Sequence, residues 1–432
     1  MRRLLGGVET LCVVVALSVL LGAYTGLPLR LGGAQLEGGA VNPFNTAGMA
    51  FVLALTLVSA GLRWRAMLFV LRHGGPLNLL LGLALASVLW SDVPEVTLRR
   101  WVSLTQAALF GYCLLAAFPM ARVLRLLATS IGLSMLASAA VALALPAAGT
   151  MQEPSLAGAW SGVFMHKSQL GSVAALGVLC FGWLWRNEPG RRAWNICGVL
   201  LCIAMAVLAQ SRSAQLVILL AISFATFLPL LRMPGLIRLW AAYGMALTAS
   251  AFAALMILFF GDIMAALGKD ASLTGRLPGW ATLLELGLQR PFGGHGYSAF
   301  FIADNAGVED AWRNAGWVMW NAHNAYLEIL LQLGVPGLAL VSWIILEQLA
   351  RSLRECIAGD LPWASFALIY GLCHLAISAV ESTAFRGGDI VSMLLVMLLT
   401  ALRVRASARD AALRASLPRP GPGAHPLYAA HR

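Results

Sequence analysis

The chain has 432 residues, of which 59% are hydrophobic and only 11% are charged, and its mean hydropathy is +0.79. Soluble proteins carry about 25% charged residues, so water-soluble enzymes, nucleic-acid-binding domains and secreted disulfide scaffolds are excluded. Because a membrane-spanning helix needs about 20 mostly apolar residues, the composition predicts an all-α polytopic membrane protein.

Twelve apolar runs predict membrane-spanning helices. In chain order they cover residues 4–24, 47–62, 76–90, 101–118, 124–145, 169–185, 193–210, 214–231, 236–260, 325–349, 362–380 and 388–402. The first run follows Met1-Arg-Arg, as in a signal peptide. It lacks an A-x-A-type cleavage site and many runs follow it, so we expect an uncleaved first helix.

The distribution of basic residues predicts the topology. Twelve crossings put both termini on one side of the membrane, and that side receives 20 of the 30 Lys and Arg residues. By the positive-inside rule, both termini are then cytoplasmic. The net charge of +11 therefore indicates topology and not nucleic-acid binding, since no polybasic stripe interleaves with aromatics. Residues 404–432 are Pro/Gly-rich and basic and predict a disordered cytoplasmic tail.

The longest polar stretch, residues 261–322, lies between the ninth and tenth runs and is predicted to face outward. Loops of this length are usually functional, and we expect two short surface helices near 278–289 and 307–319. The stretch carries eight Trp, Phe and Tyr residues. An interfacial aromatic belt accounts for part of them, and stacking on sugar faces or covering a lipid would account for the rest.

Absent motifs narrow the chemistry. The sequence contains no G-x-x-x-x-G-K-[ST] loop, no H-E-x-x-H and no D-x-D pair, which argues against ATP hydrolysis and zinc chemistry. The seven cysteines include no C-x-x-C pair, and none lies in the long polar loop, which argues against metal binding, redox work and a disulfide there. We therefore expect no metal and no cofactor.

Two arginines stand at predicted outward positions on separate segments. Arg212 lies in the short polar break Gln210-Ser-Arg-Ser213 between two apolar runs. Arg276 precedes Pro278, a favourable first helical residue, so its guanidinium would lie beside free N–H groups of a helix start. Two such forks suit a diphosphate. The alternatives are an interfacial arginine that snorkels and a charge that only tethers the loop.

His323 opens the tenth run in Trp320-Asn-Ala-His-Asn-Ala-Tyr-Leu-Glu328. With an ordinary pKa near 6.5, a histidine can accept a proton at neutral pH. Asn324 adds to the polar patch around it, and Glu328, one turn later, could share its face and orient it. The alternatives are a capping or interfacial histidine, and a glutamate that points into a wet crevice.

Weaker candidates complete the predicted site. Lys167, one of two lysines, and Arg100 lie at other outer boundaries. His295 lies in Arg290-Pro-Phe-Gly-Gly-His-Gly-Tyr297, whose glycines indicate a tight turn or close ligand approach. His374 falls inside an apolar run, which favours a packed core histidine, and Glu381 and Arg386 flank the last outer loop, where they could pair.

Several segments together resemble the O-antigen ligase/polymerase superfamily of bacterial inner-membrane proteins. The matching stretches are Leu89-Trp-Ser-Asp-Val-Pro-Glu-Val-Thr-Leu-Arg-Arg100, Gly162-Val-Phe-Met-His-Lys167, Gln210-Ser-Arg-Ser213, Leu273-Thr-Gly-Arg276, Arg290-Pro-Phe-Gly-Gly-His-Gly-Tyr297, Ala322-His-Asn-Ala-Tyr-Leu-Glu328 and Gly334-Val-Pro-Gly337. The resemblance is strongest over 200–340, inside a transmembrane domain of residues 1–403 with the large periplasmic loop at 260–323. The Trp-Ser-Asp and His-Lys segments resemble the exopolysaccharide-polymerase branch, although Ser168-Gln169 stands where that branch often has Asn.

The resemblance implies a GT-C-like, metal-independent, inverting glycosyltransferase of the inner membrane. Its donor would be an undecaprenyl-diphosphate-linked glycan, and its acceptor another glycan or lipid A-core. Arg212 and Arg276 would hold the diphosphate, and His323, with Glu328, would orient or deprotonate the acceptor hydroxyl. Substrate binding would fall to Arg290, His295, Tyr297, Lys167, Arg100 and Asn324. The oligomeric state and the choice between polymerase and ligase stay open.

Two other classes remain. A transporter or flippase for a lipid-linked saccharide would carry ionisable residues deep in several spans, whereas here they gather at the outer surface. A non-catalytic envelope scaffold would tolerate Arg212→Ala and Arg276→Ala without a change in cell glycans.

Overall fold

The computed structural model describes residues 2–31, 42–154, 156–266, 276–302, 306–316, 318–383, 385 and 387–416. The regular secondary structure in this part of the chain is helical, apart from an isolated bridge between Thr150 and Trp160. Each predicted apolar run falls on a helix. In chain order these helices are α1 (Arg2–Leu20), α3 (Pro43–Leu62), α5 (Pro76–Ala86), α6 (Pro94–Ala117), α7 (Met120–Ala144), α9 (Lys167–Asn187), α10 (Arg192–Leu208), α11 (Arg212–Phe227), α12 (Leu236–Ala266), α15 (Ala325–Ala358), α16 (Ala364–Ile377) and α17 (Ile390–Ser416).

Short helices connect or flank these. They are α2 (Leu27–Leu31), α4 (Trp64–Arg72), α8 (Pro146–Gly149), α13 (Arg276–Gln289) and α14 (Ala306–Ala315), with single 3-10 turns at Ser87–Leu89, Pro189–Arg191 and Leu230–Arg232. The two helices predicted within the long polar stretch are confirmed as helices by α13 and α14. Three of these short helices, α2, α4 and α8, were not predicted.

The described residues include seven helices long and apolar enough to cross a membrane, or eight if the bent pair Trp64–Arg72 and Pro76–Leu89 forms one span. Shorter apolar helices cover Gly7–Leu20, Leu236–Phe252 and Ala364–Ile377. The protein is thus an all-helical membrane protein, and the total of twelve crossings stays a prediction.

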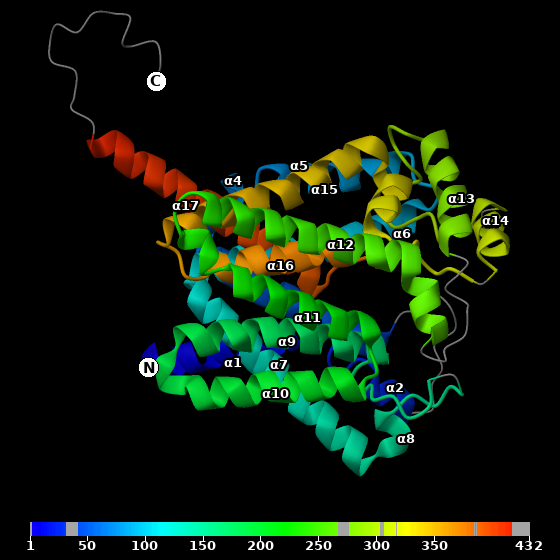
Figure 1. Cartoon of the computed structure of the whole chain (residues 1–432), viewed down its shortest axis with the longest axis horizontal. Coiled ribbons are helices and arrows are strands. Elements are labelled where there is room, and N and C mark those ends of the chain that lie inside the picture. The colour runs from blue at the N-terminus through cyan, green and yellow to red at the C-terminus, as the bar shows by residue number, and fades with distance from the viewer. Residues whose placement is uncertain are drawn as a thin grey trace, which may run out of the picture.

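The long helices lie side by side in one bundle (Figure 1). The start of α1 and the end of α17 lie at one end, and α13 and α14 lie at the other. This arrangement agrees with an even number of passes. Below, the first is called the terminal end of the bundle and the second the α13 end.

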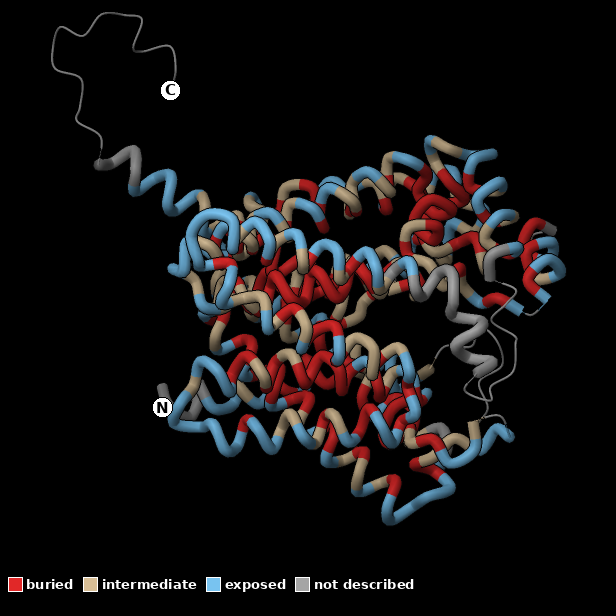
Figure 2. Tube along the Cα trace, in the orientation of Figure 1, coloured by how far each residue is buried: buried red, intermediate tan, exposed pale blue. Residues whose placement is uncertain are grey.

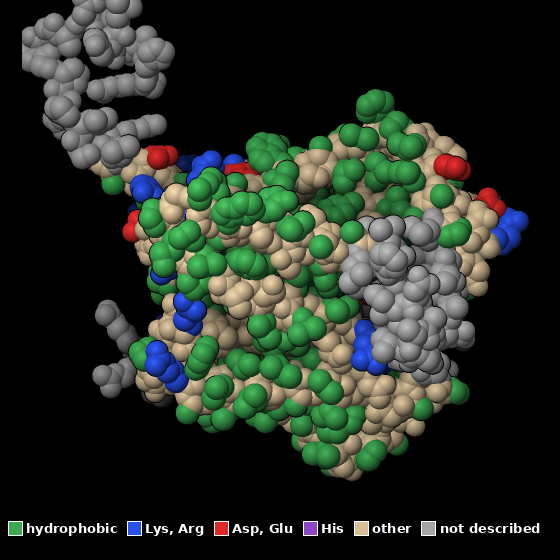
Figure 3. Space-filling model, viewed as in Figure 1, with side chains coloured by type: hydrophobic (Ala, Val, Ile, Leu, Met, Phe, Trp, Pro, Cys, Tyr) green, Lys and Arg blue, Asp and Glu red, His purple; other side chains and the backbone are tan. Residues whose placement is uncertain are grey.

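The core follows the inward faces of the helices (Figure 2). In α17 seven consecutive residues, Met393 to Leu399, are each at most 2% exposed. A helix that is apolar and buried on all sides lies inside a larger assembly, so α17 is central. Large apolar side chains such as Leu57 and Leu219 are exposed on the outside instead, and Figure 3 shows apolar side chains over the middle of the visible face. Lipid would cover such a surface.

The predicted disordered tail is wrong for residues 404–416, because α17 continues to Ser416. The stretch Arg405-Ala-Ser-Ala-Arg-Asp-Ala-Ala-Leu-Arg414 is rich in strong helix formers and holds no Gly or Pro. The helix propensity of this stretch therefore extends α17 past the end of the predicted apolar run. The rest of that prediction, residues 417–432, lies outside the described residues.

Candidate active site

The turn before α15 holds His323. The φ of His323 is +48°, in the left-handed region that residues with a side chain seldom adopt, and its N–H donates to Oδ1 of Asn321 at 3.0 Å. Asn324 is the N-cap of α15, where its Oδ1 accepts from the N–H groups of Tyr326 and Leu327 at 3.0 and 3.1 Å. The two asparagines therefore fix the backbone on either side of His323. Asn324, expected to bind substrate, has its side-chain oxygen engaged in the cap.

The imidazole of His323 faces Glu381. Nδ1 of His323 lies 3.5 Å from Oε2 of Glu381, and the two side chains are 24% and 35% exposed. Glu381 lies in the turn that follows α16, where its N–H donates to the carbonyl of Ile377 at 2.9 Å. The pair therefore places a ring nitrogen and a carboxylate oxygen side by side at a partly exposed position. The expected partner of Glu381, Arg386, lies outside the described residues.

Glu328 makes hydrogen bonds to both turns that carry this pair. Its carboxylate is 6% exposed, and one oxygen, Oε2, accepts from the N–H of Ala322 at 2.7 Å and from Oγ of Ser382 at 3.1 Å. Ala322 precedes His323 and Ser382 follows Glu381, so one buried carboxylate ties the two turns together. Its other oxygen accepts from Nε2 of Gln332 at 3.1 Å. These contacts of Glu328 are with the turns on either side of the pair and with Gln332, and its expected role of orienting His323 stays a prediction.

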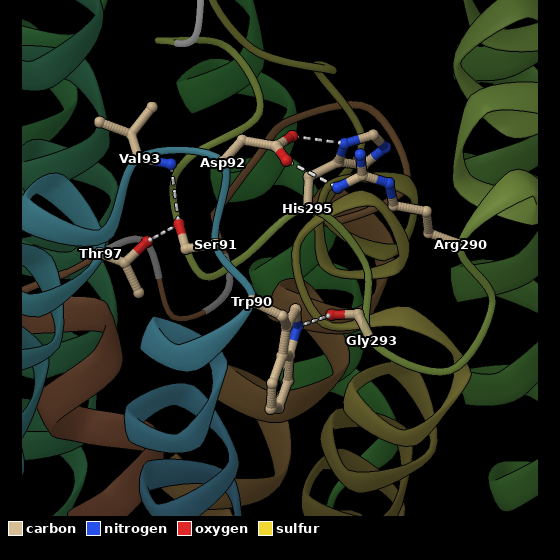
Figure 4. Close-up of polar contacts among 8 residues, drawn as sticks. All are labelled: Trp90, Ser91, Asp92, Val93, Thr97, Arg290, Gly293 and His295. Carbon is tan, nitrogen blue, oxygen red and sulfur yellow. Dashed lines mark hydrogen bonds and ion pairs between the residues drawn. The ribbon is translucent and has the colours of Figure 1, made fainter.

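A second polar cluster joins the segment 290–297 to the turn between α5 and α6 (Figure 4). Arg290 donates from Nη1 to Oδ1 of Asp92 at 2.6 Å, and His295 donates from Nδ1 to Oδ2 of Asp92 at 2.8 Å. The indole N–H of Trp90 adds a hydrogen bond to the carbonyl of Gly293 at 2.9 Å. Arg290 and His295 were predicted as substrate-binding residues, and in this structure Asp92 holds both.

The Asp92 carboxylate is ionised more readily than an ordinary aspartate. Partial burial acts to raise the pKa of Asp92, but hydrogen bonds and charge from Arg290 and His295 outweigh burial and hold that pKa below its usual range. Arg290 is 49% exposed, whereas His295 is 8% exposed. The His295 contact is therefore the better shielded of the two.

The segment 290–297 lies against a break in α15. At Gly334 φ is +65°, and the helix is kinked there. The freed carbonyls of Leu331 and Gln332 accept from the N–H groups of His295 and Gly296 at 2.8 and 3.0 Å. A Cβ on Gly334 would lie 2.4 Å from the carbonyl oxygen of Pro291, so only glycine fits.

Tyr297, the last residue of that segment, is a core residue. It is 1% exposed, and its hydroxyl donates to the carbonyl of Phe385 at 2.6 Å. The expected substrate-binding role of Tyr297 stays a prediction. Tyr297 links the loop to the turn that leads into α17, two residues after the Glu381–Thr383 turn.

Arg212 and Lys167 meet at the start of α11. Arg212 is the first residue of α11 and is exposed, and its Nη1 lies 3.5 Å from Oε1 of Gln215. Nζ of Lys167 is buried and donates to the carbonyl of Gln210 at 3.4 Å. The next residue back, His166, caps α9. Burial first, and then the charge of Lys167, lower the pKa of His166.

Arg212 and the Glu381 turn lie at the same end of neighbouring helices. α11 and α16 pack together, and Sγ of Cys373 lies 4.0 Å from the carbonyl oxygen of Val217. The two helices run in opposite directions (Figure 1). Arg212 lies five residues before this contact and Ser378 five after it, about 7 Å along each helix axis. The structure therefore brings Arg212 and the His323–Glu381 pair to the α13 end.

Two predicted residues receive less definition. Arg276 is the first residue of α13, two residues before the predicted start of that helix. Its side chain lies outside the described residues. Arg100 is exposed on the first part of α6. Among the described residues no group of three or more His, Cys, Asp or Glu side chains could hold a metal ion.

Asp92 and Ser382 belong to these polar clusters but were not singled out from the sequence. Glu381 was named only as a candidate partner of Arg386, and its place beside His323 was not predicted. The signal for Asp92 was its place in the Trp90-Ser-Asp-Val-Pro94 segment, but its partners lie about 200 residues away, at separations of 198 and 203.

Comparison with known proteins shows what this part of the chain is similar to. Residues 197–342 match the family described as O-Antigen ligase. The chain is also 26% identical over 296 residues to "Exopolysaccharide production protein ExoQ" of Rhizobium meliloti (strain 1021). That match covers 64% of this chain and 65% of the relative, so it spans just under two thirds of the relative's length. The matched region contains the starts of α11, α13 and α15, where Arg212, Arg276 and His323 lie. By these two matches the chain is similar to the O-antigen ligase/polymerase superfamily of bacterial membrane proteins.

Proposed function

We propose that the protein is an inner-membrane glycosyltransferase that moves glycan from undecaprenyl diphosphate to an acceptor hydroxyl at the periplasmic face. The observation that carries the proposal is the His323–Glu381 pair, 3.5 Å apart, at the same end of the bundle as Arg212. The turn that holds His323 lies inside the family match, and Glu381 lies in a second turn outside it. Both termini are then cytoplasmic, as the charge distribution predicts.

The reaction requires one proton acceptor and one site for a departing anion. The acceptor oxygen attacks the anomeric carbon, the bond from that carbon to the diphosphate oxygen breaks, and the hydroxyl proton passes to the imidazole of His323. The carboxylate of Glu381 stabilises the imidazolium. Arg212 and Arg276 neutralise the charge that develops on the leaving diphosphate. One displacement of this kind inverts the anomeric centre, and no metal takes part.

Several residues position this machinery without touching the reacting atoms. Glu328 and Ser382 hold the two turns that carry His323 and Glu381. Asp92 anchors Arg290 and His295, which keeps the long loop seated on α15. Lys167 is placed to hold the turn before Arg212, and its charge adds to the positive potential there.

The relative's name favours a polysaccharide product. It is an exopolysaccharide production protein, so polymerisation of exopolysaccharide repeats is the first reaction to test, and ligation to lipid A-core is the second. In a strain without this gene, loss of long chains with lipid-linked single repeats remaining supports polymerisation. Full-length chains stranded on undecaprenyl diphosphate support ligation. An unchanged glycan profile, in the absence of a redundant copy, refutes both.

Purified protein in liposomes separates the enzyme from its rivals. Given a lipid-linked glycan on the accessible face, it should form product without moving the glycan across the bilayer, and His323→Ala should abolish product. Chelators should leave the rate unchanged. Transport without product would indicate a flippase, and a strict need for a divalent metal would contradict the mechanism.

A further inference from the structure

The terminal end of the bundle carries an open, basic cavity far from His323. Its volume is about 570 Å³, and its lining includes Arg72, His73, Arg351, Arg403 and Asp410. α15 connects the two ends: His323 precedes its first residue, and Arg351 lies near its end, up to about 40 Å away along the helix. The cavity is therefore separate from the site proposed above and does not depend on the reaction there.

The charges around the cavity do not cancel. Arg351 and Arg403 each donate from Nε to the same oxygen of Glu347, at 2.6 and 2.8 Å. With Arg72 and Asp410 included, three arginines meet two carboxylates, so one positive charge is left over. A phosphodiester carries one negative charge and accepts the planar guanidinium fork well.

The arginines at the back of the cavity are held in place. Arg351, Arg403 and Glu347 are 28%, 22% and 12% exposed, and Nη1 of Arg403 lies 3.5 Å from the carbonyl oxygen of His73. Salt screens partly buried charges less than exposed ones. The cavity therefore presents preorganised positive charge, with Arg72 exposed at its mouth.

The neighbouring helix α4 indicates that the ligand is a lipid. α4 meets the segment Pro76–Leu89 at 90°, so α4 lies along the membrane surface if α5 crosses the membrane. Its side chains Trp64, Leu68 and Phe69 are exposed, and Cζ of Arg65 lies 5.2 Å from the centre of the Trp64 ring. Apolar and aromatic surface beside a basic pocket is typical of the membrane interface.

We propose that this cavity binds the phosphodiester headgroup of an anionic phospholipid, with the acyl chains lying along the exposed apolar surface near α4. The observations that carry the proposal are the three converging arginines, their one uncompensated charge and the adjacent apolar helix. Lys and Arg side chains also gather at this end of the molecule in Figure 3.

The test uses the purified full chain in detergent and native mass spectrometry with phosphatidylglycerol as the probe and phosphatidylethanolamine as the zwitterionic competitor. A juxtamembrane arginine contributes about five-fold to anionic-lipid affinity. Arg72→Gln should therefore weaken phosphatidylglycerol binding about five-fold. Asp410→Asn, which raises the excess charge, should strengthen it. Arg65→Gln is the matched control, since Arg65 lies on the same helix but does not line the cavity.

The outcomes separate the alternatives. Equal losses in Arg72→Gln and Arg65→Gln, or no loss in either, would overturn the cavity as the site. Weaker binding by Asp410→Asn would overturn the charge argument. Glycerol 3-phosphate serves as a water-soluble probe. If it displaces phosphatidylglycerol at millimolar concentration, and if Arg72→Gln weakens its binding to the same extent, the cavity binds soluble phosphates and the lipid assignment is refuted.

Discussion

Removing the carboxylate of Glu328 tests whether it acts through charge or through position. Glu328→Ala leaves the N–H of Ala322 without its acceptor at 2.7 Å, and a buried donor left unsatisfied costs about 1–3 kcal/mol. If the turn must be held for His323 to react, that cost falls on the transition state. Because each 1.36 kcal/mol is tenfold in rate, glycan formation should fall about 5- to 150-fold.

Glu328→Gln provides the discriminating comparison. The amide keeps one oxygen for the N–H of Ala322, and its NH₂ group can donate to Oγ of Ser382 or to Gln332 once that amide turns round. A positioning role therefore predicts activity within about three-fold of wild type, since only neutral hydrogen bonds are exchanged. A role as acid, base or charge predicts that Glu328→Gln is as damaged as Glu328→Ala.

The assay is the amount of long-chain surface polysaccharide restored in a strain that lacks the gene, normalised to membrane-inserted protein. Glu285→Gln, on the exposed face of α13, is the control for loss of a carboxylate at this end of the molecule. Equal loss in the Ala and Gln variants would refute positioning, and full activity of Glu328→Ala would refute any role for the Glu328 carboxylate.

Four further outcomes follow. Asp92→Ala should lower the free energy of unfolding by about 1–3 kcal/mol, mostly through loss of the shielded histidine contact, since the half-exposed arginine pair contributes under about 1 kcal/mol. The unfolding temperature can be measured by labelling buried cysteines during heating, and an unchanged unfolding temperature would contradict the prediction. Gly334→Ala should prevent correct insertion or folding, because of its positive φ and the 2.4 Å approach, whereas Gly61→Ala, with open space around it, should behave as wild type in gel filtration. The pKa of His166 is lowered by burial, so the contribution of His166 to stability is present above about pH 6.5 and is lost as the pH falls below that value. Hydrogen exchange in the first turn of α9, corrected for intrinsic rates, should be faster near pH 5.5 than near pH 7.5, and equal exchange at the two pH values would refute this role of His166. Arg276→Lys should be severely impaired because a point charge cannot replace a guanidinium fork, and near-normal polysaccharide would remove Arg276 from the mechanism.

Local sequence properties were enough to find the helices. Every predicted apolar run lies on a helix, and α13 and α14 begin within two residues of their predicted starts. These helices could be predicted because the length of an apolar run, a Pro at a helix start and a polar break each determine structure through residues that are close in sequence. The same reasoning missed α4 and the extension of α17, where helix propensity continues outside the apolar runs.

The site was predictable only in part. The sequence identified His323, Arg212 and Arg276 as residues at helix starts, because position relative to a helix start is a local property. It did not identify the partners, because His323 meets Glu381 across 58 residues and Asp92 meets His295 across 203.

By itself, then, the sequence determined a helical membrane protein with its candidate site residues at the ends of apolar runs, since hydropathy and charge order those positions along the chain. Only the tertiary structure decided that Asp92 bonds to Arg290 and His295, and that the carboxylate of Glu328 bonds to the turn that holds His323. Which carboxylate meets which cation depends on how helices pack, and a kink such as the one at Gly334 frees carbonyls for a partner that no local pattern specifies.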